Sequence, residues 1–238
     1  MVAFAGSDPI GVLIGAKRTS GTLIHKIAVH PDHLRQGHAH HLLESLGSKL
    51  AILGPPRIVA EVPETLAPAC ALFTASGYVQ EAVLTDYVLE GDENGPGAAR
   101  VEGLALSNVE GFVIPVTVDD LAANGLFGQG HPSVCWQRSV ETLTARKEDI
   151  EGLAVASDER IEAYLLYTKS GEETEIASLR SLVEDGGARL KQLLSRLGAQ
   201  GIRTFRFPKV HPAEISKDWL TELGFRPADG HRLYAATL

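Results

Sequence analysis

The chain repeats one order of secondary-structure elements, and this repeat constrains the fold more than any other feature of the sequence. A glycine followed by an aromatic residue stands near the end of each half of the chain, as Gly77-Tyr78 and Gly224-Phe225. Each pair precedes a tyrosine, Tyr87 or Tyr234, by the same interval. Because equal spacing of this kind is typical of an internal structural repeat, we expect two copies of one folding unit.

The residue patterns of the first copy predict a mixed sheet with helices on its faces. Short apolar or alternating runs between turn residues predict strands, and apolar residues at helical spacing predict helices. The expected strands are Val2–Ala5, Ile10–Lys17, Thr22–Val29, Arg57–Val62 and Tyr78–Leu89, and the expected helices are Arg35–Ile52 and Thr65–Ala75. The order of strands and helices favours an α/β (α+β mixed sheet) fold.

The second copy predicts the same closing order of elements after an extra strand and two helices. The expected strands are Val113–Val116, Leu153–Ala156, Ile161–Thr168, Thr174–Leu179, Thr204–Phe207 and a last strand to Leu238, and the expected helices are Val118–Leu126, Ser139–Arg146, Gly187–Leu197 and Ile215–Leu223. The turn-rich segment Gly91–Gly97 is either a hairpin or a linker. We expect tandem domains at 1–98 and 99–238.

Composition excludes several classes of function. A net charge of −8 argues against a nucleic-acid partner, because phosphate contacts need clustered Lys and Arg. Cys70 and Cys135 are far apart and show no metal-site spacing, which fits a reducing compartment. No apolar stretch approaches the length of a membrane span. We therefore expect a cytoplasmic protein without a nucleic-acid or membrane partner.

The segment from Ile27 to Leu43 carries the most specific chemical signal. Pro31 follows an apolar strand, and the small residues Gly37 and Ala39 stand where the next helix begins. Small residues let the backbone approach a phosphate closely, and the free N–H groups and positive dipole end of a new helix favour anions. The pattern indicates a phosphate-binding turn, with a plain strand–turn–helix as the alternative.

This segment resembles the acetyl-CoA signature of the GNAT superfamily of N-acetyltransferases, in which Leu/Ile-Ala-Val and Pro precede Arg/Gln-x-x-Gly-x-Gly/Ala and a leucine-rich helix. The motif-level resemblance covers about Leu23–Tyr78. It implies that the first copy binds acetyl-CoA, with the diphosphate at the helix start and the pantetheine arm along a splayed strand. The residues implied to bind the cofactor are Ile27, Ala28, Val29, Arg35, Gln36, Gly37, His38, Ala39, His40 and Phe73.

The chain departs from the family pattern at four positions. Leu34 replaces the Arg or Gln three residues before the first glycine, and Leu23 stands where many relatives carry a general-base Glu. Phe73 stands where many relatives carry an acidic Tyr near the thiolate of CoA, and Leu66 stands where they carry an Asn seven residues earlier. The resemblance therefore supports cofactor binding better than it supports the usual catalytic pair.

His25 is the substitute general base that we predict for the first copy. Period-two alternation places it on the strand face of Leu23, and an imidazole titrates near neutral pH. A hydrogen-bonded structural histidine is the alternative. In the second copy, Glu175 occupies the position aligned with Leu23, so it is the second candidate catalytic residue.

A histidine cluster does not by itself predict a metal site. Six of the nine histidines fall between His25 and His41, and His38 and His41 are one helical turn apart. No carboxylate or thiol stands nearby at matched spacing. We expect phosphate contacts or solvated side chains at the helix start, and no metal.

The strand-to-helix loop of the second copy looks unable to hold a diphosphate. Alignment of the copies predicts that four residues are missing between strand and helix, and Glu184-Asp185 stand where an anion would bind. Two carboxylates there would repel phosphate. We therefore expect the second copy to be a degenerate one without cofactor binding, with a structural or substrate-shaping role.

The first copy begins directly with a hairpin, without the strand and two helices that usually wall the acceptor pocket in the family. Together these features predict an acetyl-CoA-dependent N-acetyltransferase acting on a primary amine of a small molecule or peptide. A catalytically impaired acyl-CoA-binding or scaffold protein is the alternative, and a purely structural protein is a third. The sequence leaves the acceptor and any homo-oligomer open.

Overall fold

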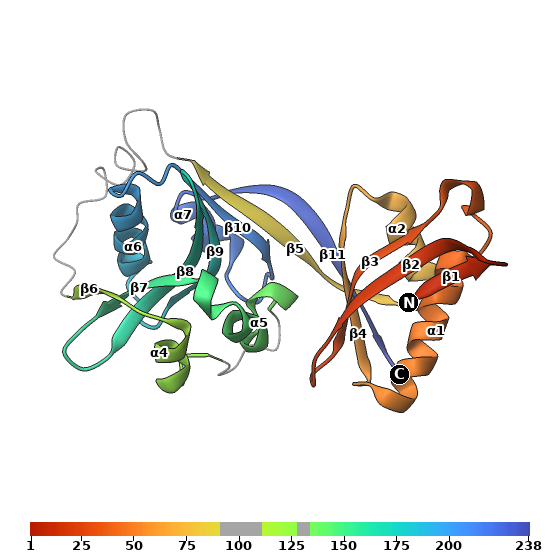
Figure 1. Ribbon diagram of the computed structural model, residues 1–238. Helices are drawn as coiled ribbons and strands as arrows, with labels where there is room; N and C mark the ends of the chain where they lie inside the picture. Colours follow the sequence, from red (N-terminus) through yellow and green to blue (C-terminus); the bar gives the residue numbers. More distant parts are fainter. Residues whose placement is uncertain (91–110, 128–133) are drawn as a thin grey trace. The chain divides into compact units, whose positions relative to one another are not determined.

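The computed structural model describes residues 1–90, 111–127 and 134–238 (Figure 1). The turn-rich segment Gly91–Gly97 and the predicted boundary between residues 98 and 99 lie outside the described residues. Contacts divide the chain into two compact units. Unit 1 comprises residues 1–84 and 229–238, and unit 2 comprises residues 85–228.

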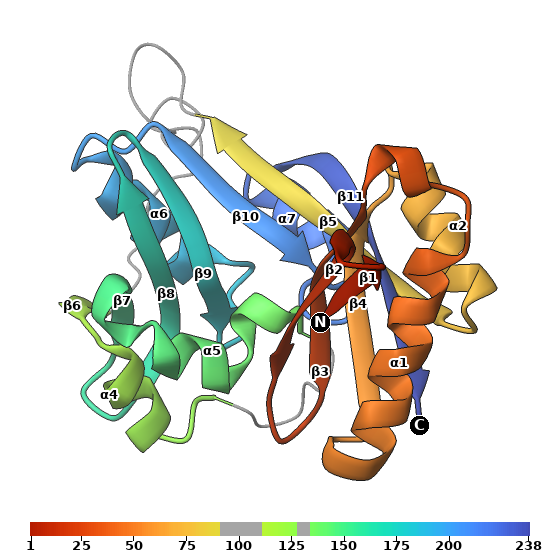
Figure 2. The ribbon, with the colours of Figure 1, turned by 45° about the vertical axis from the view of Figure 1, so that its right-hand side comes forward.

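Unit 1 is a mixed sheet with helices on one face (Figure 2). Its strands follow the spatial order β1-β2-β3-β4-β11. Its elements are β1 (Val2–Ala5), β2 (Asp8–Lys17), β3 (Thr22–Val29), η1 (Pro31–His33), α1 (His38–Leu53), β4 (Arg57–Pro63) and α2 (Ala67–Ala75), the first part of β5 (Val79–Glu90) and the last part of β11 (Arg226–Thr237). This order matches the sequence-based expectation closely.

The core of unit 1 forms between α1, α2 and the sheet. The leucines of α1 that recur at helical spacing, Leu42, Leu43, Leu46 and Leu50, are all buried. They pack with Leu13 of β2 and with the other members of one apolar cluster. Burial of a leucine side chain is worth about 1.5–3 kcal/mol, so this face of α1 fixes the helix on the sheet.

Unit 2 has helices on both faces of its sheet. Its strands follow the order β5-β10-β9-β8-β7-β6. Its elements are β6 (Phe112–Pro115), α4 (Val118–Ala123), η2 (Trp136–Arg138), α5 (Val140–Ala145), η3 (Lys147–Asp149), β7 (Glu151–Ala156), β8 (Ile161–Ser170), β9 (Glu173–Ser181), α6 (Ala188–Gly198), β10 (Thr204–Val210) and α7 (Lys217–Glu222). One apolar cluster joins α6 and α7 to the sheet, and a second joins α4 and α5 to its other face (Figure 2).

Three large apolar side chains on the first two strands of unit 1 are exposed. The exposed apolar side chains Val2 and Phe4 lie on β1, and Ile14 lies on β2. None of the three belongs to the core that α1 and α2 cover.

The two units exchange their last strands, which the sequence pattern did not predict. Strand β11, at the end of the chain, pairs antiparallel with β4 of unit 1. Strand β5, which ends the first copy in the sequence, pairs antiparallel with β10 of unit 2 from Thr85 to Glu90. The equivalent tyrosines are exchanged as well, because Tyr87 lies in the core of unit 2 and Tyr234 in the core of unit 1. The division of the sequence into copies at 98 and 99 stays a prediction.

Substitution of the exchanged tyrosines tests this crossed assembly. Tyr234→Ala removes a fully buried ring from unit 1 and should cost about 3–5 kcal/mol there. Hydrogen exchange should then accelerate in α1 and β4. Tyr87→Ala should accelerate exchange in α6 and β10 instead. Each variant is the control for the other, and the opposite assignment of effects would show that each sequence half keeps its own strand.

Candidate functional site

Strands β3 and β4 of unit 1 separate at a defined point. They pair in parallel only from Thr22 to Ile24 of β3, opposite Ile58 to Ala60 of β4. Beyond Ile24, β3 continues to Val29 while bonded to β2 alone, and β4 continues to Pro63 while bonded to β11. The edge of β3 that faced β4 is therefore open from His25 onward, as the predicted splayed strand requires.

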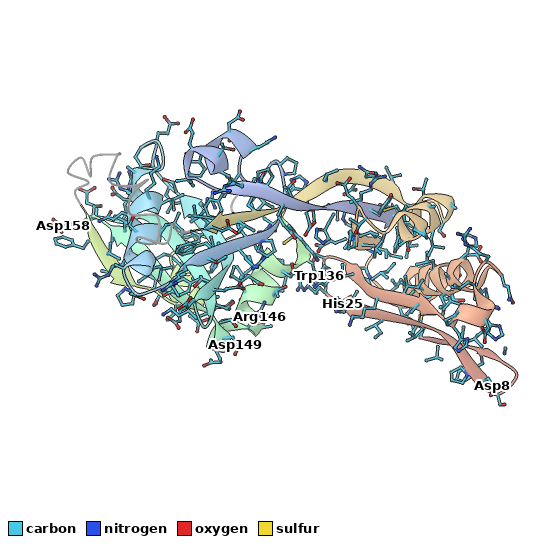
Figure 3. All side chains as sticks on the ribbon, turned by 90° about the horizontal axis from the view of Figure 1, so that it is seen from above. Asp8, His25, Trp136, Arg146, Asp149 and Asp158 are labelled. Carbon is cyan, nitrogen blue, oxygen red and sulfur yellow. The ribbon has the colours of Figure 1, made fainter. Side chains whose placement is uncertain are left out.

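His25 is the extra residue of a β-bulge at this point. In the β2–β3 ladder, Gly15 pairs with Ile24 and Ile14 pairs with Lys26, so His25 has no partner residue. Ile24 and Ile27 both pack on the helix-covered core although they are three residues apart, which accounts for the bulge. His25 is exposed and lies outside that core (Figure 3). The structure thus leaves its imidazole accessible, as a general base requires.

The loop between β3 and α1 is exposed and has an unusual backbone. Gly37 adopts φ 84° and is the residue that starts α1. Arg35 adopts φ 62°, a left-handed conformation that costs a residue with a Cβ roughly 1 kcal/mol. The Gln36 side chain donates to the Asp32 carbonyl at 3.1 Å, which braces the loop against η1. Gln36 therefore serves the loop conformation first, and its predicted role as a cofactor contact stays a prediction.

The first turn of α1 has neither a side-chain cap nor an acidic residue. Among the described residues, no side chain accepts a hydrogen bond from the N–H groups at its start, and the first helical residues are His38, Ala39 and His40. The N–H groups at a helix start have no partner within the helix. In α1 they follow the exposed Gly37 and lie at the positive end of the helix dipole, which suits an anion.

The histidines near this loop have structural contacts. His40 shares a hydrogen bond of 2.8 Å between its Nδ1 and Ser76 Oγ, and its Nε2 lies 3.3 Å from Glu44 Oε1. Both ring nitrogens of His40 are thus engaged, so only its backbone is left for a ligand. The rings of His33 and His38 meet edge to face at 5.9 Å. Within the described residues, no group of three potential metal ligands gathers.

An aromatic cluster lies beside the strand opening. Phe73 of α2 is buried, stacks on Tyr234 at 5.7 Å between ring centroids, and meets Tyr78 edge to face. Burial raises the pKa of Tyr78 to about 12, so that phenol stays neutral. Phe73 is therefore a core residue, and its predicted contact with the cofactor is not tested.

Tyr234 brings a hydroxyl group to the neighbourhood of Phe73. It pairs with Ala60, the last residue of β4 that is bonded to β3. Arg232 donates to the Tyr234 hydroxyl and, at 3.3 Å, to Glu64, and both contacts raise the pKa of Arg232. The Arg232 side chain is 40% exposed. Tyr234 itself is buried, so its hydroxyl lies among buried side chains next to the partly exposed Arg232.

Unit 2 has an equivalent strand separation. Strands β9 and β10 pair in parallel only up to Glu175 and Arg206. Strand β9 also has a bulge, at Ala177, and Glu175 precedes it by two residues just as Leu23 precedes His25. The structure therefore supports the alignment of Glu175 with Leu23. Glu175 is exposed, on the last paired rung.

The start of α6 in unit 2 is closed by the protein itself. Gly187 has the same left-handed conformation as Gly37, with φ 79°. The Asp185 carboxylate accepts the N–H groups of Gly187 at 2.9 Å and Arg189 at 3.0 Å. The Arg189 side chain, which is also bonded to Glu162, donates to the same carboxylate. Asp185 thus takes the place that a bound anion would have.

The loop before α6 is two residues shorter than its counterpart, not four as alignment of the leucines predicted. Its glycine follows the bulge residue Ala177 by 10 positions, whereas Gly37 follows His25 by 12. The leucine alignment was wrong because the buried stripes of the two helices begin at different distances from the helix start. The cap, more than the loop length, distinguishes the units.

Arg138 closes one side of the strand separation in unit 2. Its side chain is 2% exposed and donates to both carboxylate oxygens of Glu214, at 2.8 and 3.0 Å. It also donates to the carbonyl groups of Pro208 and Lys209, which follow the last paired rung of β10. Those carbonyl groups are therefore occupied from within.

Comparison with known proteins agrees with this geometry. The model of the Acetyltransferase (GNAT) family matches residues 1–78. These residues contain the open strand, the exposed loop and the start of α1. Residues 1–78 are therefore similar to the GNAT family.

The fold of the whole chain is similar to solved GNAT structures. A tandem GNAT protein from the clavulanic acid biosynthesis pathway, solved without AcCoA, aligns at TM-score 0.65 and 17% identity over 99% of this chain and 81% of that one. A GCN5-related N-acetyltransferase from Sphaerobacter thermophilus aligns at TM-score 0.63 and 13% identity over 98% and 78%. A glucosamine N-acetyltransferase region of a fungal multi-domain β-N-acetylglucosaminidase aligns at TM-score 0.73 and 12% identity over 98% and 32%. Among curated proteins, none matches the sequence.

The expected GNAT recognition and tandem mixed-sheet fold are thus confirmed. The structure brings the predicted residues Ile27–Val29 and Arg35–His40 together in unit 1, on one strand end, loop and helix start. His25 belongs to unit 1 and Glu175 to unit 2. Across the described residues, no helix is both long and apolar enough to cross a membrane.

Sequence reasoning missed the contacts of Tyr234 and Arg138. The repeat had aligned Tyr234 with Tyr87, but the exchange of strands, which places Tyr234 beside Phe73, depends on contacts distant in the sequence. Arg138 donates to carbonyl groups that lie about 70 residues later in the chain. No local pattern indicates either contact.

The acid stability of unit 2 tests the internal cap. Burial alone raises the pKa of Asp185, but hydrogen bonds from Arg189 and from the Gly187 N–H outweigh it, so the pKa lies below its usual range. The carboxylate therefore stabilises unit 2 above its unfolded pKa of about 4, and this contribution is lost as the pH falls through the folded pKa. Asp185→Asn should lower the free energy of unfolding at pH 7 and approach the wild type below about pH 4.

Tryptophan fluorescence in urea measures this difference, because both tryptophans, Trp136 and Trp219, belong to unit 2. The exposed Asp158 (Figure 3) supplies a matched control, Asp158→Asn, that should show no such pH dependence. A difference between Asp185→Asn and the wild type that stays constant from pH 7 to pH 3 would contradict the role of the cap.

Proposed function

We propose that the chain is an acetyl-CoA-dependent N-acetyltransferase that binds the cofactor in unit 1 and acts on a primary amine. The observation that carries this proposal is the contrast between two helix starts. Gly37 and Gly187 have the same backbone conformation, but only α6 carries a carboxylate cap. An anion can therefore reach the amides of α1, whereas Asp185 already satisfies those of α6.

The residues of unit 1 fit the parts of the cofactor. The amides of Gly37 to His40 would hold the diphosphate, helped by the exposed Arg35 side chain. The open edge of β3 from Lys26 to Val29 would bond the amide groups of the pantetheine arm as an added strand. A backbone N–H near Val29 would polarise the thioester carbonyl.

The chemistry proposed here is attack of a neutral amine on the thioester carbonyl. An N–C bond forms, the C–S bond breaks, and the products are an N-acetylated amine and the free thiol. His25, exposed at the bulge, would take the proton from the amine directly or through water. The Tyr234 hydroxyl, next to the position where relatives carry an acidic Tyr, would give a proton to the departing thiolate.

The rival proposal is an acyl-CoA-binding protein without turnover. It is favoured by Leu23 and Phe73, which replace the usual base and acid. It predicts cofactor binding in unit 1 but no release of thiol with any amine. A purely structural protein would bind no cofactor. Measuring cofactor binding first and turnover second therefore distinguishes the enzyme, the binding protein and the structural protein.

Transplanting the internal cap into unit 1 tests the proposed cofactor site. Arg35 precedes Gly37 by two residues, as Asp185 precedes Gly187. Arg35→Asp should place a carboxylate at the start of α1 and weaken acetyl-CoA binding by about tenfold or more. Arg35→Asn has nearly the same shape without the charge and tolerates the left-handed backbone, so it should lose much less.

Isothermal titration calorimetry with acetyl-CoA and desulfo-CoA on the full chain measures both affinities. Circular dichroism checks that the variants are folded. Equal affinities for Arg35→Asp and Arg35→Asn, or no binding by the wild type at millimolar cofactor, would refute a cofactor site at α1.

Turnover tests the proposed acid. Thiol release from acetyl-CoA over a panel of primary amines should identify an acceptor. With that acceptor, Tyr234→Phe should lower kcat about tenfold to a hundredfold and leave the affinity for acetyl-CoA unchanged. Adding Phe73→Tyr should restore part of the lost rate, because the hydroxyl returns to the stacked neighbour.

Full activity of Tyr234→Phe would exclude this tyrosine as the acid while leaving the cofactor site intact. Cofactor binding without thiol release from any amine would favour the rival proposal.

A further inference from the structure

Unit 2 contains a cavity that the proposed acetyl transfer in unit 1 does not use. Its volume is about 290 Å³, near the lower end of the range for small-molecule sites. The end of β9, the helices α5 and α7, and the residues after α4 form its walls. It lies where β9 has separated from β10, so a sheet strand does not fill it.

The cavity has one apolar side and one polar side. The apolar side includes Phe127, Leu143, Ile215 and Trp219. Leu143 and Ile215 are buried, and Phe127 meets the Tyr164 ring edge to face at 6.1 Å. Such a surface favours an aromatic or branched apolar group about the size of one or two rings.

The polar side carries one positive charge in excess. Arg138 and Glu214 both line the cavity, but their ion pair at 2.8 Å cancels their charges. Arg180 also lines it, and its guanidinium has a long hydrogen bond of 3.4 Å to the Leu126 carbonyl. Among the described residues, no carboxylate forms an ion pair with Arg180.

The Tyr164 hydroxyl lies beside Arg180. The two residues are directly opposite each other in the β8–β9 ladder. Tyr164 also forms a side-chain hydrogen bond with Ser178, and its ring is buried. An acceptor atom placed in the cavity would thus meet a guanidinium and a phenol from adjacent strands, the donors that a carboxylate prefers.

We propose that this cavity binds a small organic acid, whose carboxylate pairs with Arg180 and the Tyr164 hydroxyl and whose apolar body packs against Phe127, Leu143 and Trp219. The ligand is not the cofactor, because Asp185 and Arg138 occupy the groups that a CoA molecule would need in unit 2. The second copy is then a binding module for a small anion. This inference does not depend on the function proposed for unit 1.

Matched ligands test the proposed charge preference. Phenylacetate, phenylacetamide and 2-phenylethylamine have similar size and differ in charge, and benzoate and 2-naphthoate vary the apolar body. Isothermal titration calorimetry on the full chain without acetyl-CoA should show that the best of the three acids binds. Phenylacetate should bind about tenfold or more tightly than its amide, and the amine should bind weakest.

Two arginine variants locate the site. Arg180→Gln should reduce the affinity for phenylacetate to that for phenylacetamide. Arg196→Gln makes the same charge change at an exposed position on α6 that does not line the cavity, and it should bind like the wild type. The ligand series on the wild type keeps the test valid even if Arg180→Gln fails to fold.

The proposal is overturned if none of the three acids binds at about 10 mM to the folded wild type, far weaker than a specific site would be. It is equally overturned if the amine binds as tightly as the acid, or if folded Arg180→Gln keeps the wild-type affinity. Acetyl-CoA binding is measured separately at unit 1, so failure here leaves that function untouched.

Discussion

The unsatisfied N–H groups at the start of the helix that follows each separated strand pair are the constraint on which the proposed function depends. A helix begins with N–H groups that have no partner in the helix, and something outside it must satisfy them. In α6 the carboxylate of Asp185 does so, held in place by Arg189 and Glu162. In α1 no side chain of the described residues does so. One fold thus produces a closed site and an open one, and the difference lies in a single side chain.

The same contrast extends to the strands before each helix. The parallel ladders of both units end after a few rungs, and each departing strand has a bulge near that point. In unit 2, Arg138 reaches from η2 and bonds the carbonyl groups that follow the ladder. Arg138 thus occupies the strand opening of unit 2 from within, while a cavity remains beside Arg180.

Exchange of the last strands makes the two units depend on each other. Neither sequence half contains all the strands of the unit that it builds, because β5 completes unit 2 and β11 completes unit 1. The exchange has a chemical consequence for unit 1. It brings Tyr234 from the end of the chain onto Phe73, and so places a phenol beside the residue that stands where the family resemblance predicts an acidic Tyr.

Local patterns in the sequence predicted most of the fold and part of the site. The order of strands and helices, the loop with Gly37 and the unsuitability of Asp185 as a phosphate neighbour all follow from spacing and residue type within short segments. The bulge that sets off His25, the strand exchange and the contacts of Arg138 could not be predicted. Each depends on pairing or contact between segments that are far apart in the sequence. Alternation along a single strand does not indicate which other segment it will pair with.

A crystal structure of the full chain grown with saturating acetyl-CoA tests the central claim most directly. The account predicts cofactor density in unit 1, with the diphosphate at the amides of Gly37 to His40 and the pantetheine arm along the open edge of β3. Density beside Gly187, or none in either unit, would contradict it.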